Sequence, residues 1–291
     1  MIYLKLHDRM GNVMFMLAAA LFISDDVSVY TDNEKDEQYV KQLLDNFNIS
    51  INIIKKNDIP QCALCNFLLS PIVYKPIDYK KGEEIRLDGY FQSYKYFDIQ
   101  FARRLFKPPE FIVRKIEVQY GEMLNLGETV CVHVRRGDYM LLPERFAFVG
   151  LRYIKTAMKH FASDTLFVFT SDDIEWCKKH FRGDNIYYSE GNSPLFDMFL
   201  ATYCTHNIIS NSTFSWWGAY LNPNPTKKVI CPSRWYGPVL AQEANEKESD
   251  LIPPEWIKEK CYWDDVASFC RAYYLYARVN WRKWLHLSKT K

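Results

Sequence analysis

The segment TVCVHVRRGD, residues 129–138, joins a run of strand-forming residues to an abrupt polar end. Its first six residues are apolar or β-branched apart from one histidine, a composition typical of a strand buried in a parallel sheet. Two arginines, a glycine and an aspartate follow directly. Because ligands of open α/β sheets bind beyond the carboxyl ends of the strands, we expect a binding site where this segment becomes polar.

Strands and helices alternate outward from this segment along most of the chain. Downstream, strands are predicted at residues 165–170, 185–188, 207–210 and 229–231, with helices between them. Upstream, strands are predicted at residues 2–6, 27–30 and 51–54, whereas residues 60–110 are interpreted as irregular. Such alternation forms parallel sheets with right-handed crossovers. We therefore predict an α/β protein with two Rossmann-like domains, residues 1–110 and 111–260, that face a cleft.

Residues 261–291 form a third segment of different composition. A long C-terminal helix is predicted at residues 264–287, and it is rich in tyrosine, tryptophan and arginine. Packing of this helix across the two domains is the favoured interpretation. The alternative is peripheral contact with a membrane, because basic and aromatic side chains suit the headgroup region.

Composition limits the classes of partner. Lys and Arg total 37 against 35 Asp and Glu, a formal net charge of +2 in 291 residues. A near-balanced chain lacks the broad positive field of a non-specific nucleic-acid binder, so no nucleic-acid partner is expected. The best apolar stretch, Val13 to Ile23, is too short to span a bilayer, and no signal peptide is recognised. We expect a cytosolic protein.

The eight cysteines are interpreted as reduced structural residues. Cys62 and Cys65 have the spacing of half a zinc site, but no second pair of cysteines and no nearby pair of histidines completes it. Cys131 and Cys231 lie in apolar, strand-like runs, where a thiol behaves as a small core residue. No metal site is predicted.

The first polar cluster follows the strand at residues 129–134. A guanidinium pairs two phosphate oxygens and can stabilise a diphosphate leaving group, and we assign this contact to Arg135. Arg135 shares its strand face with His133. For Arg136 and Asp138, ligand binding and a structural ion pair at the strand end both remain open.

The second cluster is the aspartate pair Asp172 and Asp173, which follows the next predicted strand. A carboxylate at this position can accept the N1 and N2 hydrogens of guanine. The alternative is an N-cap for the following helix, and a combination in which one aspartate caps while the other binds the base is also open. A divalent metal usually requires more than two adjacent carboxylates.

The third cluster lies in the segment NIISNSTFSWWGAY, residues 207–220, where a strand runs through a turn rich in serine and threonine into a helix. The N–H groups at the start of a helix, together with hydroxyl groups, form an anion site. Ordinary N-capping requires one such side chain, and this helix start has four residues with hydroxyl groups around it. The hydroxyl groups beyond the one that capping requires favour a ligand at this helix start.

These motifs resemble those of the α-1,2-fucosyltransferases of glycosyltransferase family 11. Members of this family begin with G-x-L-G-N-Q, carry H-V-R-R-G-D-Y near mid-chain, then S-D-D, and later N-S-T-F-S-W-W-G-A. The matching segments in this chain are residues 8–13, 133–139, 171–173 and 211–219, with L-D-G-Y-F-Q-S at residues 87–93 as a further match. Together they span most of the chain to about residue 235.

The resemblance implies a GT-B fold and an inverting transfer of L-fucose from GDP-fucose to O-2 of a terminal galactoside, without a cofactor or a required metal. The product would belong to a surface polysaccharide or lipopolysaccharide. Arg135 would pair the β-phosphate, His133 would support the nucleotide, and Asp138 completes the implied catalytic set. The implied donor-binding residues are Gly11, Asn12, Arg136, Asp172, Asp173, Ser212, Thr213, Phe214, Ser215 and Trp216.

This sequence departs from the family pattern in the first motif, where Asp8 replaces a glycine, Met10 a leucine and Val13 a glutamine. The last change affects a polar position that we associate with the acceptor. Inversion requires a group that takes the proton of the acceptor, and spacing does not identify it. The candidates are Asp138, Glu144, His7 and Asp8.

Two other functions remain open. One is a fucosyltransferase with another linkage or acceptor, and the other is a nucleotide-sugar or glycan-binding protein without catalysis. A Rossmann dehydrogenase is disfavoured because the first turn lacks G-x-G-x-x-G.

Overall fold

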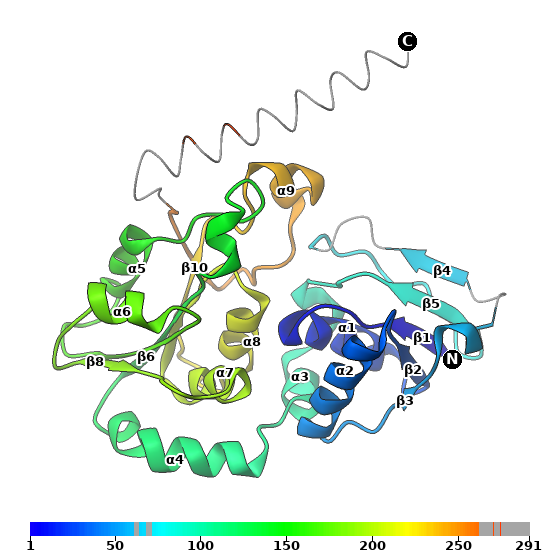
Figure 1. The fold of residues 1–291 in the computed structure, drawn as a ribbon, viewed down its shortest axis with the longest axis horizontal. Coiled ribbons are helices and arrows are strands. Elements are labelled where there is room, and N and C mark those ends of the chain that lie inside the picture. Colours follow the sequence, from blue (N-terminus) through cyan, green and yellow to red (C-terminus); the bar gives the residue numbers. More distant parts are fainter. Residues whose placement is uncertain (61–63, 68–71, 262–269, 271–273, 275–291) are drawn as a thin grey trace. The chain divides into compact units, whose positions relative to one another are not determined.

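The computed structural model describes residues 1–60, 64–67, 72–261, 270 and 274, and the chain forms two compact units. The first unit consists of Met1–Arg114 together with Lys247–Pro254. The second consists of Lys115–Glu246 together with the described residues from Glu255 onward. Each unit contains one sheet whose strand pairs are all parallel (Figure 1). The predicted α/β class is therefore confirmed.

The first unit has a five-stranded sheet in the order β3-β2-β1-β5-β4. Its elements in chain order are β1 (Ile2–Lys5), α1 (Met10–Ile23), β2 (Val27–Tyr30), α2 (Glu34–Asn46), β3 (Asn52–Ile53), β4 (Leu64–Phe67), β5 (Ile85–Asp88) and α3 (Ile99–Leu105). Helix α1 is apolar on nearly all sides, and most of its residues are buried. The predicted strands at residues 2–6, 27–30 and 51–54 correspond to β1, β2 and β3.

Residues 60–110 are more regular than the sequence predicts, since β4, β5 and α3 lie there. Strand β5 has only four residues, and it pairs with β1 on one side and with β4 on the other. A strand this short owes its conformation to its neighbours in the sheet, so its own sequence carries a weak signal.

The second unit has a six-stranded sheet in the order β11-β10-β9-β6-β7-β8. Helix α4 (Glu110–Asn125) leads into it, and the elements that follow are β6 (Thr129–Val134), α5 (Leu151–Met158), β7 (Leu166–Ser171), α6 (Ile174–His180), β8 (Ile186–Tyr188), α7 (Pro194–Tyr203), β9 (His206–Ile208), α8 (Thr213–Leu221), β10 (Val229–Pro232), α9 (Pro238–Glu243) and β11 (Ile257–Glu259). This order places β6 beside β9. Strands β7 and β8 extend the sheet on the side of β6, and strands β10 and β11 extend it on the side of β9.

The strands of the second sheet are covered on both faces. Val130, Val132 and Val134 of β6 pack in one buried cluster with Tyr153 and Ile154 of α5. Cys131 and His133, which alternate with those valines, lie on the other face with residues of α7 and α8. The face against α7 and α8 therefore carries the polar residue of the strand.

The domain prediction of residues 111–260 differs from the structure at residues 111–114 and at Lys247–Pro254, which belong to the first unit. The contacts of Asp250 explain the placement of the second of these segments. Its backbone N–H donates to the carbonyl of Ile72 at 2.8 Å, and its carboxylate accepts from the N–H of Tyr74 at 3.0 Å. Lys95 forms an ion pair with the same carboxylate at 2.5 Å.

The predicted helix at residues 264–287 lies outside the described residues except for Cys270 and Tyr274, so its packing or membrane role stays a prediction. Both of these residues are exposed. In the described part of the chain, no helix is both long and apolar enough to cross a bilayer.

Candidate functional site

The loops after β6 and β9 meet at the point where the order of the second sheet reverses, which is where open α/β sheets bind ligands. The backbone N–H of Arg135 donates to Ser210 Oγ at 3.0 Å, and Ser210 Oγ donates to the carbonyl of His133 at 2.7 Å. Three residues beyond Ser210, α8 begins at Thr213. The structure thus brings the predicted Arg135 together with the turn that leads into α8.

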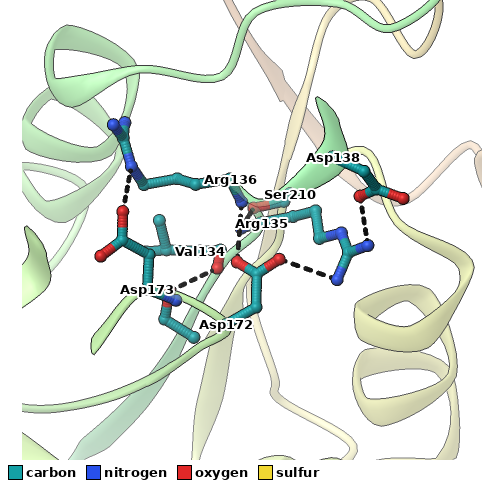
Figure 2. A network of polar contacts seen from close by, with 8 residues as sticks. Val134, Arg135, Arg136, Asp138, Asp172, Asp173 and Ser210 are labelled. Carbon is teal, nitrogen blue, oxygen red and sulfur yellow. Dashed lines mark hydrogen bonds and ion pairs between the residues drawn. The ribbon is translucent and has the colours of Figure 1, made fainter. Parts of the chain in front are cut away.

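Arg135 is held between two carboxylates (Figure 2). Its Nη1 lies 2.8 Å from Asp172 Oδ2, and its Nη2 pairs with Asp138 Oδ1. Its guanidinium also lies 5.1 Å from the ring centre of Tyr139, within range of a cation–π contact. The arginine that we expect to bind phosphate is therefore already oriented, and it is neutralised by the protein itself.

Arg136 points away from Arg135 in Figure 2. Its Nε donates to Asp173 Oδ2 at 3.0 Å, and its guanidinium lies 4.1 Å from the ring centre of Trp176. Of the two interpretations left open for Arg136, the structure shows the ion pair. Arg136 packs against α6 because successive residues of an extended segment point to opposite faces, and its contact with the donor stays a prediction.

Both predicted base-reading aspartates make contacts within the protein. Asp172 Oδ1 accepts from the backbone N–H of Arg136 at 2.9 Å, while its Oδ2 faces Arg135. Asp173 caps α6, because its Oδ1 accepts from the N–H of Trp176 at 3.2 Å. The capping interpretation thus holds for Asp173. Asp172 instead contacts the side chain of Arg135 and the backbone N–H of Arg136.

The serine-rich turn before α8 divides into internal and accessible residues. Ser215 is buried, and its hydroxyl donates to the carbonyls of Ser210 and Ser212 at 3.1 and 3.0 Å. Trp216 is fully buried. Ser215 and Trp216, which the sequence analysis assigns to binding of the donor substrate, therefore face the core. Thr213 and Phe214 are half-buried, and Ser212 makes no side-chain capping bond to the start of α8.

A small cavity lies between the sheet and helices α7 and α8 at this end of β6. It is lined by Cys131, His133, Thr170, Asp197, Met198, Ala201, Asn207, Ile208, Ile209, Phe214, Ser215 and Gly218. The ring of His133 lies against Phe214, with 5.0 Å between ring centres. His133 Nδ1 is buried and has no hydrogen-bond partner among the described residues. The cavity has a volume of about 10 Å³, which is room for about one water molecule or one polar group of a ligand, and a buried ring nitrogen of this kind calls for such a partner.

The cavity also contains a carboxylate that the sequence analysis does not select. Asp197 accepts a hydrogen bond from Ser189 Oγ at 2.5 Å. Burial raises the pKa of Asp197 to about 6, against the lowering effects of that bond and of Lys115. An aspartate inside the otherwise apolar stretch LFDMFLATY, residues 195–203, is the signal that could have identified it.

His133 stays neutral in the folded protein. Burial, with a further contribution from Arg135, lowers its pKa to about 3. Between this value and the ordinary value near 6.5, the unfolded chain binds a proton that the folded chain does not, so falling pH removes stability. Asp197 acts in the opposite sense, because a raised carboxyl pKa favours the folded state at low pH and this contribution is lost as pH rises through about 6.

We expect His133→Gln to gain stability relative to the wild type as the solution is acidified. From pH 7 to pH 5 the difference in unfolding free energy between the two proteins should shift by roughly 2 kcal/mol towards the variant. Urea unfolding at both pH values measures it. A difference that stays constant over this range would show that His133 is not held neutral.

The predicted Gly11 and Asn12 lie in the first unit, at the start of α1. Asn12 Nδ2 donates to Asp8 Oδ2 at 2.7 Å, and Asn12 Oδ1 accepts from Gln92 Nε2 at 2.8 Å. The loops after β1 and β5 are joined through this amide. Asp8 has a φ of 74°, a left-handed conformation that explains why the family motif has glycine at this position.

The four candidate bases lie in different surroundings. Asp138 forms an ion pair with Arg135, and 47% of its side chain is accessible to solvent. Glu144 has one buried carboxylate oxygen without a hydrogen-bond partner among the described residues. His7 lies edge-on to the ring of Tyr90 at 4.7 Å, and burial lowers its pKa. Asp8 is exposed.

The predicted absence of a zinc site involves Cys62, which lies outside the described residues. Across residues 1–60, 64–67, 72–261, 270 and 274, no three His, Cys, Asp or Glu side chains form a group that could hold a metal ion. The cysteines at 131, 177, 204 and 231 are free and buried.

The sequence model of the family described as "Glycosyl transferase family 11" matches residues 1–260. The chain therefore belongs to this family and is a glycosyltransferase.

Two relatives agree with this membership. The chain is 32% identical over 221 residues to an alpha-1,2-colitosyltransferase of Escherichia coli, a match that covers 69% of this chain and 72% of the relative. It is 33% identical over 196 residues to galactoside alpha-(1,2)-fucosyltransferase 1 of Homo sapiens, covering 60% of this chain and 52% of that protein. Among solved structures, NodZ alpha-1,6-fucosyltransferase co-crystallized with GDP matches with a TM-score of 0.47 and 14% identity, over 75% of this chain and 91% of that one.

Proposed function

We propose that this protein transfers L-fucose from GDP-fucose to O-2 of a terminal galactoside, with inversion at the anomeric carbon. The observation that carries the proposal is the position of Arg135, on the loop joined to the β9–α8 turn at the reversal of the second sheet. A guanidinium and the N–H groups at the start of a helix are the donors that a diphosphate requires.

The reaction exchanges one bond at the anomeric carbon. The acceptor oxygen attacks C1 of the fucosyl group, while the bond from C1 to the β-phosphate oxygen breaks and GDP leaves with the electron pair. Arg135 stabilises the negative charge that develops on that oxygen. The proton of the acceptor hydroxyl passes to a carboxylate, an imidazole or a phosphate oxygen. Charge stabilisation by Arg135 and by α8 requires no cofactor and no metal.

We further propose that the hydrogen-bonding edge of guanine binds at the cavity lined by His133 and Asp197, whose volume of about 10 Å³ takes one polar group and not the whole base. The half-buried carboxylate of Asp197 can accept the N1 and N2 hydrogens of guanine, and the unpartnered His133 Nδ1 offers a further hydrogen-bonding site. This assignment moves base recognition from Asp172 and Asp173, whose oxygens face the two arginines and α6, to a carboxylate on α7.

Asp197→Asn is expected to remove the preference for GDP over inosine diphosphate, which lacks the exocyclic amino group. A lost charge-assisted hydrogen bond lowers the affinity for GDP about tenfold. Calorimetry with both nucleotides measures the preference. The control is Asp184→Asn, which changes an exposed aspartate of the same unit. An unchanged preference in Asp197→Asn would place the base elsewhere.

The acceptor is proposed to be a galactose-terminated glycan of a surface polysaccharide or lipopolysaccharide, modified in the bacterial cytoplasm. An acceptor panel that includes lactose and Gal-GlcNAc, with GDP-fucose as donor and NMR of the product linkage, tests it. A product linked through another hydroxyl supports the alternative of another linkage. GDP binding without transfer to any acceptor supports the alternative of a non-catalytic binding protein.

A second donor is supported by the similarity to a colitosyltransferase. Colitose is fucose without the 3-hydroxyl group, so the diphosphate and base contacts above serve both donors. Competition between GDP-fucose and GDP-colitose in one reaction separates them. A preference for fucose requires a protein group that hydrogen-bonds O-3, because a site with such a group rejects an analogue that lacks the hydroxyl.

A further inference from the structure

The two carboxylates on Arg135 differ in how firmly the fold holds them. Asp172 accepts the backbone N–H of Arg136 at 2.9 Å with one oxygen and faces Arg135 Nη1 at 2.8 Å with the other. Its side chain is 26% exposed. A methyl group added at Gly137 would lie 2.5 Å from Asp172 Oδ2, so this carboxylate sits directly against the main chain.

Asp138 approaches Arg135 from the opposite side and from solvent. It is the first residue of a short 3-10 turn, Asp138–Leu141, and 47% of its side chain is exposed against 18% for Arg135. Ion pairs with an exposed partner contribute little free energy and exchange readily with water. Of the two contacts on the guanidinium, the contact from Asp138 is therefore the weaker.

The charge at this point is unfavourable for a diphosphate. One guanidinium faces two carboxylates, so the group as a whole is negative before any ligand arrives. A diphosphate adds at least two further negative charges, and like charges at contact distance repel strongly in a partly buried site. At least one carboxylate has to leave Arg135 when the nucleotide binds.

We infer that Asp138 occupies the place of a diphosphate oxygen on Arg135 in the free protein and is displaced by the nucleotide, whereas Asp172 remains and holds the guanidinium in its binding orientation. Asp172 is thus a positioning residue and Asp138 an internal competitor. The inference rests on the proposed assignment of Arg135 to the phosphates.

After displacement, Arg135 retains two supports. Asp172 keeps Nη1, and the ring of Tyr139 remains beside the guanidinium at 5.1 Å. Tyr139 is itself stacked on Phe146, with 3.9 Å between ring centres and 7° between ring planes. The Nη2 edge of the guanidinium, which faces Asp138 in the free protein, becomes the edge that receives the phosphate.

Two isosteric variants test the inference through effects of opposite sign. Asp138→Asn removes the competing charge, and we expect GDP to bind up to about fivefold more tightly, in line with the value of an exposed ion pair. Asp172→Asn removes the positioning charge, and we expect GDP to bind at least about tenfold more weakly. Calorimetry on the full chain measures both.

Guanosine is the matched ligand control because it lacks the phosphates. Its affinity should be the same in the wild type and in Asp138→Asn. A tighter affinity for guanosine would mean that the variant alters the base pocket, and it would overturn the inference.

Asp138→Asn decides the inference by itself, because it changes an exposed residue on a turn and leaves the core intact. Unchanged or weaker GDP binding by this variant overturns the inference, as does unchanged GDP binding by Asp172→Asn. Failure of the proposed donor site has a different signature, since the wild-type protein would then bind neither GDP nor guanosine, and failure of the proposed transfer would leave GDP binding intact without turnover.

Discussion

Replacing Arg135 with alanine is expected to lower the turnover of GDP-fucose by about a thousandfold, the upper range for loss of one donor that stabilises developing charge. The guanidinium is placed by the backbone bond from Arg135 to Ser210 and by the carboxylate of Asp172. Arg136, the neighbouring arginine, pairs with Asp173 and packs on Trp176 instead.

The measurement is GDP release at saturating acceptor, with far-UV circular dichroism to confirm folding. Arg145→Ala serves as the control, because Arg145 is an exposed arginine of the same unit. Arg135→Lys should fall between the wild type and the alanine variant, since an ammonium keeps the charge but loses the planar fork. Near-normal turnover in Arg135→Ala would remove its role at the leaving group.

Trp216→Ala is expected to destabilise the second unit by about 3–5 kcal/mol, the range for removal of a large buried aromatic side chain. Trp216 is fully buried and stacks on Tyr220 with 4.4 Å between ring centres. It also packs against Trp217 at 5.1 Å and Trp256 at 5.6 Å. Denaturant unfolding measures the loss of stability.

Phe214→Ala is the contrasting variant, because Phe214 is half-buried and lines the cavity beside His133. We expect a small loss of stability and a clear loss of GDP affinity. If Trp216→Ala instead kept its stability and lost only donor affinity, the tryptophan would contact the donor as the sequence analysis predicts.

The fold class could be predicted from the sequence because the alternation of strands and helices is a local property. Strands β1, β2, β6 and β7 are apolar enough to be recognised from their residues alone. Strands β4 and β5 are too short for that and depend on partners far along the chain. The return of Lys247–Pro254 to the first unit is likewise set by long-range bonds to Asp250.

The position of the candidate site could also be predicted, because the carboxyl ends of parallel strands meet at one edge. The partner of each side chain could not. Alternation along an extended segment already sends Arg135 and Arg136 to opposite sides, but only the structure shows that Arg136 packs on Trp176 of α6. The same holds for Ser215 and Trp216, which face the core, and for Asp197, which reaches the cavity from a helix outside the motifs.

Gly137 and Asp172 have a shared constraint that neither residue reveals on its own. The carboxylate of Asp172 fills the space in which any larger residue at position 137 would place its first side-chain carbon. Alanine at 137 would require the end of the Asp172 side chain to shift, and because that carboxylate also pairs with Arg135 we expect the two positions to be coupled. Related chains that lack this glycine should also carry a smaller side chain at position 172, and a double-mutant cycle between the two positions should be strongly non-additive.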